Sequence, residues 1–509
     1  MSSYLSIFLL LLILLRCIFW LFAPPNPDEA YYWLWGQHLD FSYYDHPPLQ
    51  SWLQGWITAW FGKSLFTLRS LNLFSNGLFF YTYYRILRYL YGDLARRYIW
   101  WMIFAVLCSP LYSVMLSLAW HDHLAISLSL VGAYLCIRFL DEYLANGKGT
   151  NWRLYGSAIA LSLAHITKYN SLFMTLGLLT AIATHSQLRR LFLDIRIWLC
   201  VGIGAIAFLP VFYWNYSNNF LSFRFYANRS IDSGTLVMRL LEPLGFIGIS
   251  LLMLSPFVAW LVWQGFRNAD RENSTGILSV RQSVLLYKRI TVWTFVIPSG
   301  ILMAISLVST ALYYWNIHAY LLLFPLLPLA LADFLHPLAS SPRGRGGENL
   351  KVFYGMGVFG LIFTSLFVWN SCMFPISAVF GKDGDQDGRM IYGWQEVAAE
   401  VIKISNTLPE IPLLITSDYR SAAELAYEMQ NPNVTAISKR VSQFTIWNLE
   451  NAAKQNGKNA IVISDQWYPL TDDAIAHFDR FTPISNVQIR RFGLYLKTYE
   501  IAIGKNYKP

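Results

Sequence analysis

Residues 154–184, LYGSAIALSLAHITKYNSLFMTLGLLTAIAT, form an apolar stretch that Lys168-Tyr169-Asn170 interrupts near its middle. A helix crosses a bilayer with about 20 apolar residues, so this stretch is too long for one upright crossing. A charged side chain at membrane depth is costly, so Lys168 is better placed at a turn. The stretch therefore predicts two short helices that meet at Lys168, inside a membrane protein.

The composition of the whole chain agrees with this interpretation. Of its 509 residues, 55% are hydrophobic, 17% are aromatic and only 14% are charged, whereas soluble domains carry about 25% charged residues. A disordered chain, a coiled coil and a cytosolic enzyme are thereby excluded. The net charge of +9 is not evidence for a nucleic-acid partner. In membrane proteins, basic loops mark the direction of insertion instead. The five cysteines form no disulfide framework and no CxxC pair.

Other apolar runs are long enough to cross a bilayer. With the hairpin they predict an α-helical polytopic protein of about eleven transmembrane helices. The runs lie near residues 4–22, 66–84, 98–115, 124–140, 197–213, 243–263, 291–309, 318–333 and 352–370.

Basic residues assign the two sides of the membrane. One set of connections holds eighteen Lys and Arg residues, from Arg85 to Lys351, and the alternate set holds only five. The positive-inside rule places the richer set and the amino terminus in the cytoplasm. Those five, on the other side, are Lys63, Lys168, Arg224, Arg229 and Arg239.

Beyond Trp369 the chain becomes polar. Helix-like segments at 395–405 and 420–429 alternate with β-rich runs at 411–416, 460–464 and 492–499. This alternation is typical of a small α/β domain. We expect a transmembrane domain over residues 1–370 and a soluble domain over residues 371–509 on the non-cytoplasmic side.

The first outer loop carries two adjacent acids, Asp28 and Glu29, in a stretch rich in proline and aromatics. A carboxylate at the lipid boundary is partly desolvated, which raises its pKa and makes it a competent general base. The alternative is a solvated loop whose Tyr and Trp residues form the interfacial belt. Residues 49–61 are amphipathic and short for a crossing, so we expect them in the interface.

The second outer loop holds His121, Asp122 and His123. This cluster could ligate a divalent metal if Asp28 or Asp45 joined it, contact substrate through hydrogen bonds, or cap a helix through Asp122. Further polar groups are expected on the same side of the membrane. They are Lys168, Asn215, Arg224, Tyr226, Arg229 and the rim 313–318, which ends at His318.

All these polar features fall on one side of the bilayer rather than at its midplane. A transporter is expected to place broken helices and polar residues near the membrane centre. An enzyme that acts on a lipid-tethered anionic substrate instead needs acids that activate an acceptor and cations that bind a phosphate. The arrangement favours the enzyme.

In this order along the chain, the motifs resemble those of bacterial GT-C glycosyltransferases. Asp28-Glu29-Ala30-Tyr31-Tyr32-Trp33 and Tyr44-Asp45-His46-Pro47-Pro48-Leu49 resemble the first periplasmic loop of the lipid A aminoarabinose transferases and core galacturonosyltransferases. These belong to the dolichyl-phosphate-mannose protein mannosyltransferase superfamily. The remaining matches are Asp122, Thr167-Lys168-Tyr169, Pro210 with Trp214-Asn215, His318-Ala319-Tyr320-Leu321 and Gly393-Trp394.

The resemblance implies roles for particular residues. Asp28 would be the base that activates the acceptor, and Glu29 would orient it. Asp45 and His46 stand where aminoarabinose transferases tend to carry a Glu-Lys pair before Pro-Pro, which leaves the donor sugar undefined. The substrate-binding candidates are Asp45, His46, His121, Asp122, His123, Lys168, Tyr169, Arg224, Arg229 and His318.

The resemblance also implies a reaction and a location. The protein would be an inner-membrane enzyme that moves a sugar from a polyprenyl phosphate to a periplasmic acceptor such as lipid A, lipopolysaccharide core or another envelope glycan. Protein O-glycosylation is the nearest alternative, and a lipid-linked sugar flippase is the alternative from another class. No cofactor is required, and a divalent cation is left open. The stretch 383–388 resembles the start of a calcium loop, but Trp394 occupies the position of its bidentate Glu.

Overall fold

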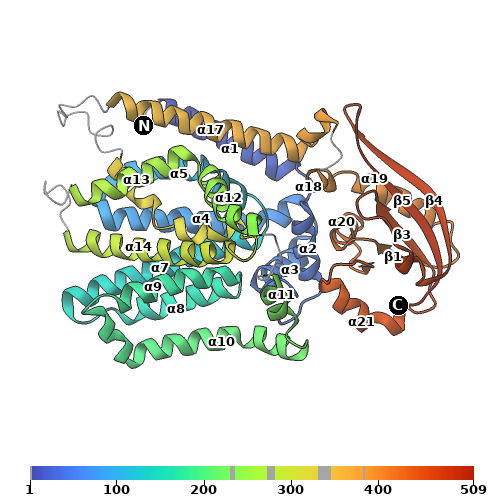
Figure 1. Ribbon diagram of the computed structural model, residues 1–509, viewed down its shortest axis with the longest axis horizontal. Coiled ribbons are helices and arrows are strands. Elements are labelled where there is room, and N and C mark those ends of the chain that lie inside the picture. Colours follow the sequence, from blue (N-terminus) through green and yellow to red (C-terminus); the bar gives the residue numbers. More distant parts are fainter. Residues whose placement is uncertain (1–2, 230–235, 272–280, 331–345, 382–384) are drawn as a thin grey trace. The chain divides into compact units, whose positions relative to one another are not determined.

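The computed structural model describes residues 3–229, 236–271, 281–330, 346–381 and 385–509 (Figure 1). Its chain forms two compact units. The first comprises Met1–Leu15, His46–Leu49 and Asn72–Thr364, and the second comprises Arg16–Asp45, Gln50–Leu71 and Ser365–Pro509. The second unit thus joins amino-terminal segments to the carboxy-terminal part of the chain.

Several described helices are long and apolar enough to cross a membrane. Five single helices meet this condition, and the pair α12 and α13, bent by 89°, adds a sixth if it forms one span. The chain is therefore a multi-pass membrane protein, and eleven crossings stay a prediction. These helices are α1 (Ser3–Phe22), α7 (His121–Asn146), α10 (Ile195–Ser217), α14 (Arg281–Ser306) and α17 (Gly346–Cys372), with α12 (Leu236–Leu254) and α13 (Pro256–Arg271).

The predicted hairpin is present. Helix α8 (Asn151–His165) ends shortly before Lys168, the 3-10 turn η2 (Tyr169–Ser171) follows, and α9 (Leu172–Ala183) continues the chain. The interruption in the apolar pattern therefore marks a true break in the helix.

Two other predicted runs differ from single helices. The run 98–115 is divided into α5 (Ala95–Leu107) and α6 (Pro110–Met115), because a proline favours the first turn of a new helix. The run 318–333 begins as 3-10 turns, η5 (Tyr313–Tyr320) and η6 (Phe324–Leu326), before the short α15 (Leu327–Ala330). Two prolines in this run lack the N–H group that a regular helix needs.

Within the first unit the long helices pack side by side. Helix α7 lies against α8, α8 against α10, and α9 against α14 (Figure 1). Small residues allow the close approach of α9 and α14, because a Cβ on Gly177 would lie 2.6 Å from the Cα of Thr294. The apolar core of this unit surrounds buried side chains such as Tyr83, Phe104 and Tyr112.

The second unit contains a five-stranded mixed sheet of order β2-β1-β3-β5-β4. Strand β1 (Leu413–Thr416) is parallel to β2 (Val434–Ala436) and β3 (Ala460–Asp465), and β5 (Leu494–Tyr507) is antiparallel to both β3 and β4 (Phe478–Arg491). The helices of this α/β part are α19 (Trp394–Ser405), α20 (Tyr419–Met429) and α21 (Gln443–Gln455).

The amino-terminal helices of the second unit complete it. Helix α2 (Pro27–Gln37) packs against α20, and α3 (Leu49–Phe61) precedes the long α4 (Leu65–Tyr91). Gly36 of α2 and Gly55 of α3 are in direct backbone contact, since a Cβ on Gly55 would lie 2.3 Å from the carbonyl oxygen of Gly36. The remaining short elements are η1 (Gly92–Leu94), η3 (Leu188–Leu193), α11 (Leu221–Arg229), η7 (Ile376–Phe380), α18 (Gln386–Met390) and α22 (Asp472–Ile475).

Candidate active site

The first turn of α2 holds Asp28 in a defined position. The Asn26 side chain caps the helix by accepting a hydrogen bond from the backbone N–H of Asp28 at 3.1 Å. In return, the backbone N–H of Asn26 donates to Glu29 Oε2 at 2.9 Å, which completes a capping box. Asp28 is partly exposed at the positive end of the helix dipole, a position that favours a carboxylate.

Glu29 points the other way and forms a buried ion pair. Its carboxylate accepts two hydrogen bonds from Arg69, at 2.9 Å from Nε and 2.6 Å from Nη2, and both side chains are almost fully buried. Arg69 also donates to the carbonyl oxygens of Phe19 and Ala23, at the end of α1, and stacks over the Phe19 ring. Glu29 thereby fixes the loop, and Asp28 is the acid of the pair that stays accessible.

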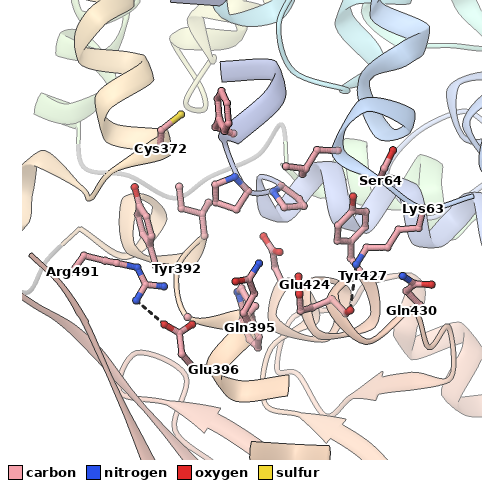
Figure 2. Close-up of a pocket in the computed structure, with 18 residues that line it drawn as sticks. Lys63, Ser64, Cys372, Tyr392, Gln395, Glu396, Glu424, Tyr427, Gln430 and Arg491 are labelled. Atoms are coloured by element: carbon pink, nitrogen blue, oxygen red, sulfur yellow. Dashed lines mark hydrogen bonds and ion pairs between the residues drawn. The ribbon is translucent and has the colours of Figure 1, made fainter. Parts of the chain in front are cut away.

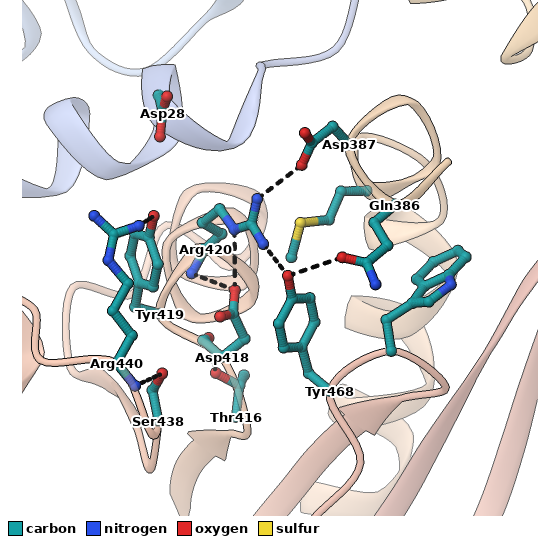
Figure 3. A network of polar contacts seen from close by, with 12 residues as sticks. Asp28, Gln386, Asp387, Thr416, Asp418, Tyr419, Arg420, Ser438, Arg440 and Tyr468 are labelled. Atoms are coloured by element: carbon teal, nitrogen blue, oxygen red, sulfur yellow. Dashed lines mark hydrogen bonds and ion pairs between the residues drawn. The ribbon is translucent and has the colours of Figure 1, made fainter. Parts of the chain in front are cut away.

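The carboxy-terminal part of the second unit supplies cations near these acids. Arg440 Nη2 lies 3.5 Å from Asp45 Oδ2, and Arg440 Nη1 donates to the Tyr419 hydroxyl at 2.6 Å. Figure 3 shows the Asp28 carboxylate on the side of α2 that faces Tyr419 and Arg440. Burial raises the pKa of the Tyr419 hydroxyl, and the charge of Asp28 raises it further.

Arg420 adds a second guanidinium group to this cluster. It donates to Asp387 at 2.9 Å and to Asp418 at 3.3 Å, and it is hydrogen-bonded to the Tyr468 hydroxyl (Figure 3). Burial alone would lower the pKa of Arg420, but the Asp418 carboxylate raises it above the ordinary value. Arg420 is therefore a fixed cation, held in place by its acidic neighbours.

Gln443 fixes the loop against the same part of the unit. Its backbone N–H donates to the Tyr31 hydroxyl at 2.9 Å, and its side-chain oxygen accepts from the backbone N–H of Tyr44 at 2.9 Å. Tyr31 also packs edge-to-face on Tyr419, with ring centroids 5.1 Å apart. These contacts hold Asp28 and Asp45 close to the arginines, so we name Asp28, Asp45, Tyr419, Arg420 and Arg440 the carboxylate–arginine cluster.

The first unit contains a second polar cluster around Lys168. The Lys168 ammonium donates to Asp122 Oδ2 at 2.6 Å and lies 5.2 Å from the centroid of the Tyr314 ring. Both charged side chains are buried. The Asn170 side chain donates to the carbonyl oxygen of Trp315 at 3.1 Å, so the break in the hairpin is tied to η5.

Four further substrate-binding candidates, His46, His121, Tyr169 and His318, lie in this second cluster, which we name the lysine–histidine cluster. The rings of His46 and His121 are 4.5 Å apart, the Tyr226 hydroxyl lies 3.4 Å from His46 Nδ1, and Tyr226 packs edge-to-face on Tyr169. Lys168 also acts electrostatically on His318, which is fully buried. The fold brings His46, His121, Asp122, Lys168, Tyr169 and His318 together from four segments of the chain.

The other predicted residues have different surroundings. His123 points away from His121 and forms a 2.7 Å hydrogen bond with Ser75 Oγ. The Arg224 side chain is exposed, and the side chain of Arg229 lies outside the described residues. Within the described part of the chain no group of three or more His, Cys, Asp or Glu residues could hold a metal ion.

Several residues of these clusters were not predicted from the sequence. Arg420, Arg440 and Tyr419 lie far along the chain from Asp28, in a segment without a motif. Arg69 could have been recognised from the sequence, because it is a charged residue within the predicted span 66–84, and charged residues within membrane spans usually have a function. Tyr314 belongs to the aromatic rim that the sequence did indicate.

Comparison with known proteins identifies a match to a family model over part of the chain and solved structures with a similar fold. Residues 45–214 match the family model described as dolichyl-phosphate-mannose-protein mannosyltransferase. The crystal structure of ArnT from Cupriavidus metallidurans bound to undecaprenyl phosphate is similar to this chain, with a TM-score of 0.60, 15% identity and 98% of both chains covered. The apo structure of the same protein matches with a TM-score of 0.58, 14% identity and the same coverage. No curated protein matches the sequence significantly.

These comparisons confirm the resemblance that the sequence indicated. The matched segment contains His46, the second outer loop and the hairpin with Lys168. The structural likeness covers nearly the whole chain, so it includes the carboxy-terminal α/β part as well as the helices. At this level of identity the likeness concerns the fold.

Proposed function

Because this chain has the GT-C fold of the ArnT type, we propose that it is a glycosyltransferase that takes its sugar from a polyprenyl phosphate and passes it to an acceptor. The similar ArnT structure is bound to undecaprenyl phosphate, which supports a donor of this class. The acceptor we propose is lipid A, lipopolysaccharide core or another envelope glycan. The reaction would take place at the periplasmic face of the inner membrane.

The proposal rests on the different surroundings of Asp28 and Glu29. Glu29 is fully engaged by Arg69, while Asp28 faces the carboxylate–arginine cluster. In the proposed reaction an acceptor hydroxyl attacks the anomeric carbon, and its proton passes to the Asp28 carboxylate. The bond between that carbon and the phosphate oxygen breaks, and the polyprenyl phosphate leaves with the electron pair.

The departing phosphate needs cations that are already in place. We propose that Lys168 provides this charge, with Asp122 holding the ammonium and His46, His121 and Tyr169 supplying hydrogen bonds. We propose that His318, which interacts electrostatically with Lys168, assists it, and that His123 anchors its segment through Ser75. Arg224 and Arg229 are the further proposed phosphate contacts.

An apolar cavity in the first unit suits the hydrocarbon chain of such a donor. It has a volume of about 520 Å³ and is lined by α12, α13, α14 and η5, with aromatic side chains such as Phe246, Trp263 and Phe295. Its polar groups are Ser250, Ser299, Asn316 and Tyr320. The Asn316 amide donates to the Tyr320 hydroxyl at 2.9 Å and to Ser299 Oγ at 3.0 Å. An apolar lining with few polar groups favours an isoprenoid chain over a sugar.

The Asp28→Asn variant of the full-length protein tests the proposal. It should lower transfer by about 10²–10⁴-fold, the usual contribution of a general base, while donor binding remains. The assay follows loss of polyprenyl-phosphate sugar in vitro and the mass of envelope glycolipids from cells. Asp40→Asn is the matched control, because Asp40 lies in the same loop and bonds to the backbone N–H of Phe41.

Different outcomes separate the candidate functions. A mass increment on lipid A or core that is lost with Asp28→Asn and kept with Asp40→Asn supports the proposal. An increment on exported proteins instead would make the chain a protein O-glycosyltransferase, in line with the description of the matched family model. Transport of an intact lipid-linked sugar, unaffected by Asp28→Asn, would overturn the enzyme assignment and favour a flippase.

A further inference from the structure

A second cavity lies within the second unit, around the carboxy-terminal half of α20. It has a volume of about 410 Å³, which is within the range of small-molecule sites. Its lining combines aromatic rings with polar side chains, and Figure 2 shows these groups around a common space. The lining includes the side chains of Tyr392, Trp394, Gln395, Glu424, Tyr427 and Gln430.

Glu424 is the distinctive residue of this cavity. Its side chain is only 3% exposed, and its Oε1 has no hydrogen-bond partner among the described residues. An unpartnered buried oxygen costs free energy unless a ligand or water completes its hydrogen bonds. Burial raises the pKa of Glu424 well above its ordinary value, and Glu29 and Glu428 raise it further against the opposing charges of Lys497 and Arg69. Burial thus favours the neutral carboxylic acid over the carboxylate, and the acid can both donate and accept.

The two cations of the lining, Arg491 and Lys63, already have partners. Arg491 pairs with Glu396 at 2.6 Å. The Lys63 ammonium donates to the carbonyl oxygen of Glu428 at 3.2 Å and lies 4.4 Å from the centroid of the Tyr427 ring (Figure 2). A phosphate is a poor ligand for this cavity, because it would meet acidic side chains while both cations are already paired. An acyl chain is also a poor ligand, because it would remove several polar groups from water without replacing their hydrogen bonds.

A hydroxyl group both donates and accepts hydrogen bonds, so it is well matched by neutral side chains that can also do both. Gln395 and Gln430 provide such groups beside Glu424, and Tyr392, Trp394 and Tyr427 provide apolar faces for the C–H surfaces of a ring. We propose that this cavity is a binding site for a neutral saccharide, with Glu424 and the glutamines contacting its hydroxyl groups.

The position of the cavity suggests which saccharide it binds. Tyr419, of the carboxylate–arginine cluster, and Glu424 lie on the same helix. The five-residue separation of these positions corresponds to about 7.5 Å along the axis and about 140° around it. A glycan that is bound at the cluster could thus place a neighbouring sugar in the cavity. Naming this sugar as part of the acceptor rests on the proposed function, whereas the binding of a saccharide does not.

Saturation-transfer NMR of the full-length protein in detergent tests the site. The probes are the methyl glycosides of glucose, galactose and mannose, together with methyl glucosaminide as an amine-bearing probe. At least one neutral glycoside should bind, and Glu424→Ala should weaken it about fivefold, the effect of losing one hydrogen bond. Glu424→Gln keeps a neutral donor and acceptor and should retain binding. Gln395→Ala, at an exposed position of the lining, should weaken binding without disturbing the fold.

The controls make the result decisive. Glu410→Gln changes an exposed acid of the same unit and should leave binding unchanged. Binding only of the glucosaminide, lost in Glu424→Gln, would show an ammonium site and overturn the proposal. No binding by any neutral glycoside, or binding indifferent to both Glu424→Ala and Gln395→Ala, would overturn it too. Asp28→Asn should lose transfer but keep glycoside binding, so failure of this site and failure of the proposed reaction are distinguishable.

Discussion

Two adjacent acids in the first turn of α2 have opposite surroundings. Glu29 is 0% exposed and pairs with Arg69, which is 1% exposed, whereas Asp28 remains partly exposed on the next position of the same helical turn. Successive residues of a helix point about 100° apart, so adjacent residues can serve the fold and the chemistry separately. The sequence singled out the pair as candidates, but it could not show which acid is buried, because Arg69 is 40 residues away.

At the scale of single residues we predict that Glu29→Gln destabilises the protein strongly. The substitution leaves the Arg69 guanidinium buried without its counterion, which typically costs about 3–5 kcal/mol. The apparent melting temperature in detergent should fall well below that of the wild type. Glu29→Gln combined with Arg69→Met should recover part of the loss, because the double variant buries no unpaired charge.

An exposed ion pair provides the comparison for that experiment. Arg88 pairs with Asp93 at the surface, with 44% and 90% of the side chains exposed, and such pairs contribute about 0–1 kcal/mol. Arg88→Met should therefore change the melting temperature little. If Glu29→Gln were as mild as Arg88→Met but abolished transfer, Glu29 would be part of the reaction rather than of the fold.

At the scale of elements, the crossing of α2 and α3 depends on two glycines. A Cβ on Gly55 would lie 2.3 Å from the carbonyl oxygen of Gly36, a backbone atom that cannot move without moving the helix. Gly55→Ala should therefore push α2 away from α3, lower the melting temperature and reduce transfer, because α2 carries Asp28. The measurements are thermal unfolding in detergent and the donor-consumption assay.

Gly77→Ala in α4 is the matched control, since nothing lies within 4 Å of its Cβ. There the substitution should be neutral or slightly stabilising, because alanine favours a helix by about 0.5–1 kcal/mol over glycine. Equal behaviour of Gly55→Ala and Gly77→Ala would mean that α2 and α3 can separate freely, against the contact described above.

The sequence predicted elements well where their pattern is strong. The hairpin break at Lys168 followed from its length and one charged residue, and the helices α19 and α20 followed from their polar periodicity. Strands β2 and β4 were missed: β2 has three residues, and β4 alternates mainly exposed and half-buried positions with little apolar signal. Their place is set by pairing with β1 and β5, which is a tertiary effect.

At the scale of the whole molecule, composition and packing divide the chain in different ways. The change in polarity near residue 370 predicts a separate soluble domain, 371–509. The structure groups those residues with Arg16–Asp45 and Gln50–Leu71 in one unit. Composition reports how polar a segment is, but it does not report which remote segment packs on it. The carboxylate–arginine cluster was not predictable for the same reason.

This grouping predicts that the chain without residues 373–509 cannot fold normally. Helix α2 buries Trp33 against Tyr427, with centroids 5.1 Å apart, and Tyr31 against Tyr419 and Phe444. Truncation would expose these rings, each of which contributes about 1.5–3 kcal/mol through burial. The 1–372 fragment should therefore elute as aggregate in size-exclusion chromatography, and separately expressed 373–509 should restore part of the monodisperse fraction. A monodisperse fragment with the melting temperature of the full chain would show instead that residues 371–509 are an independent domain and that Asp28 is held without them.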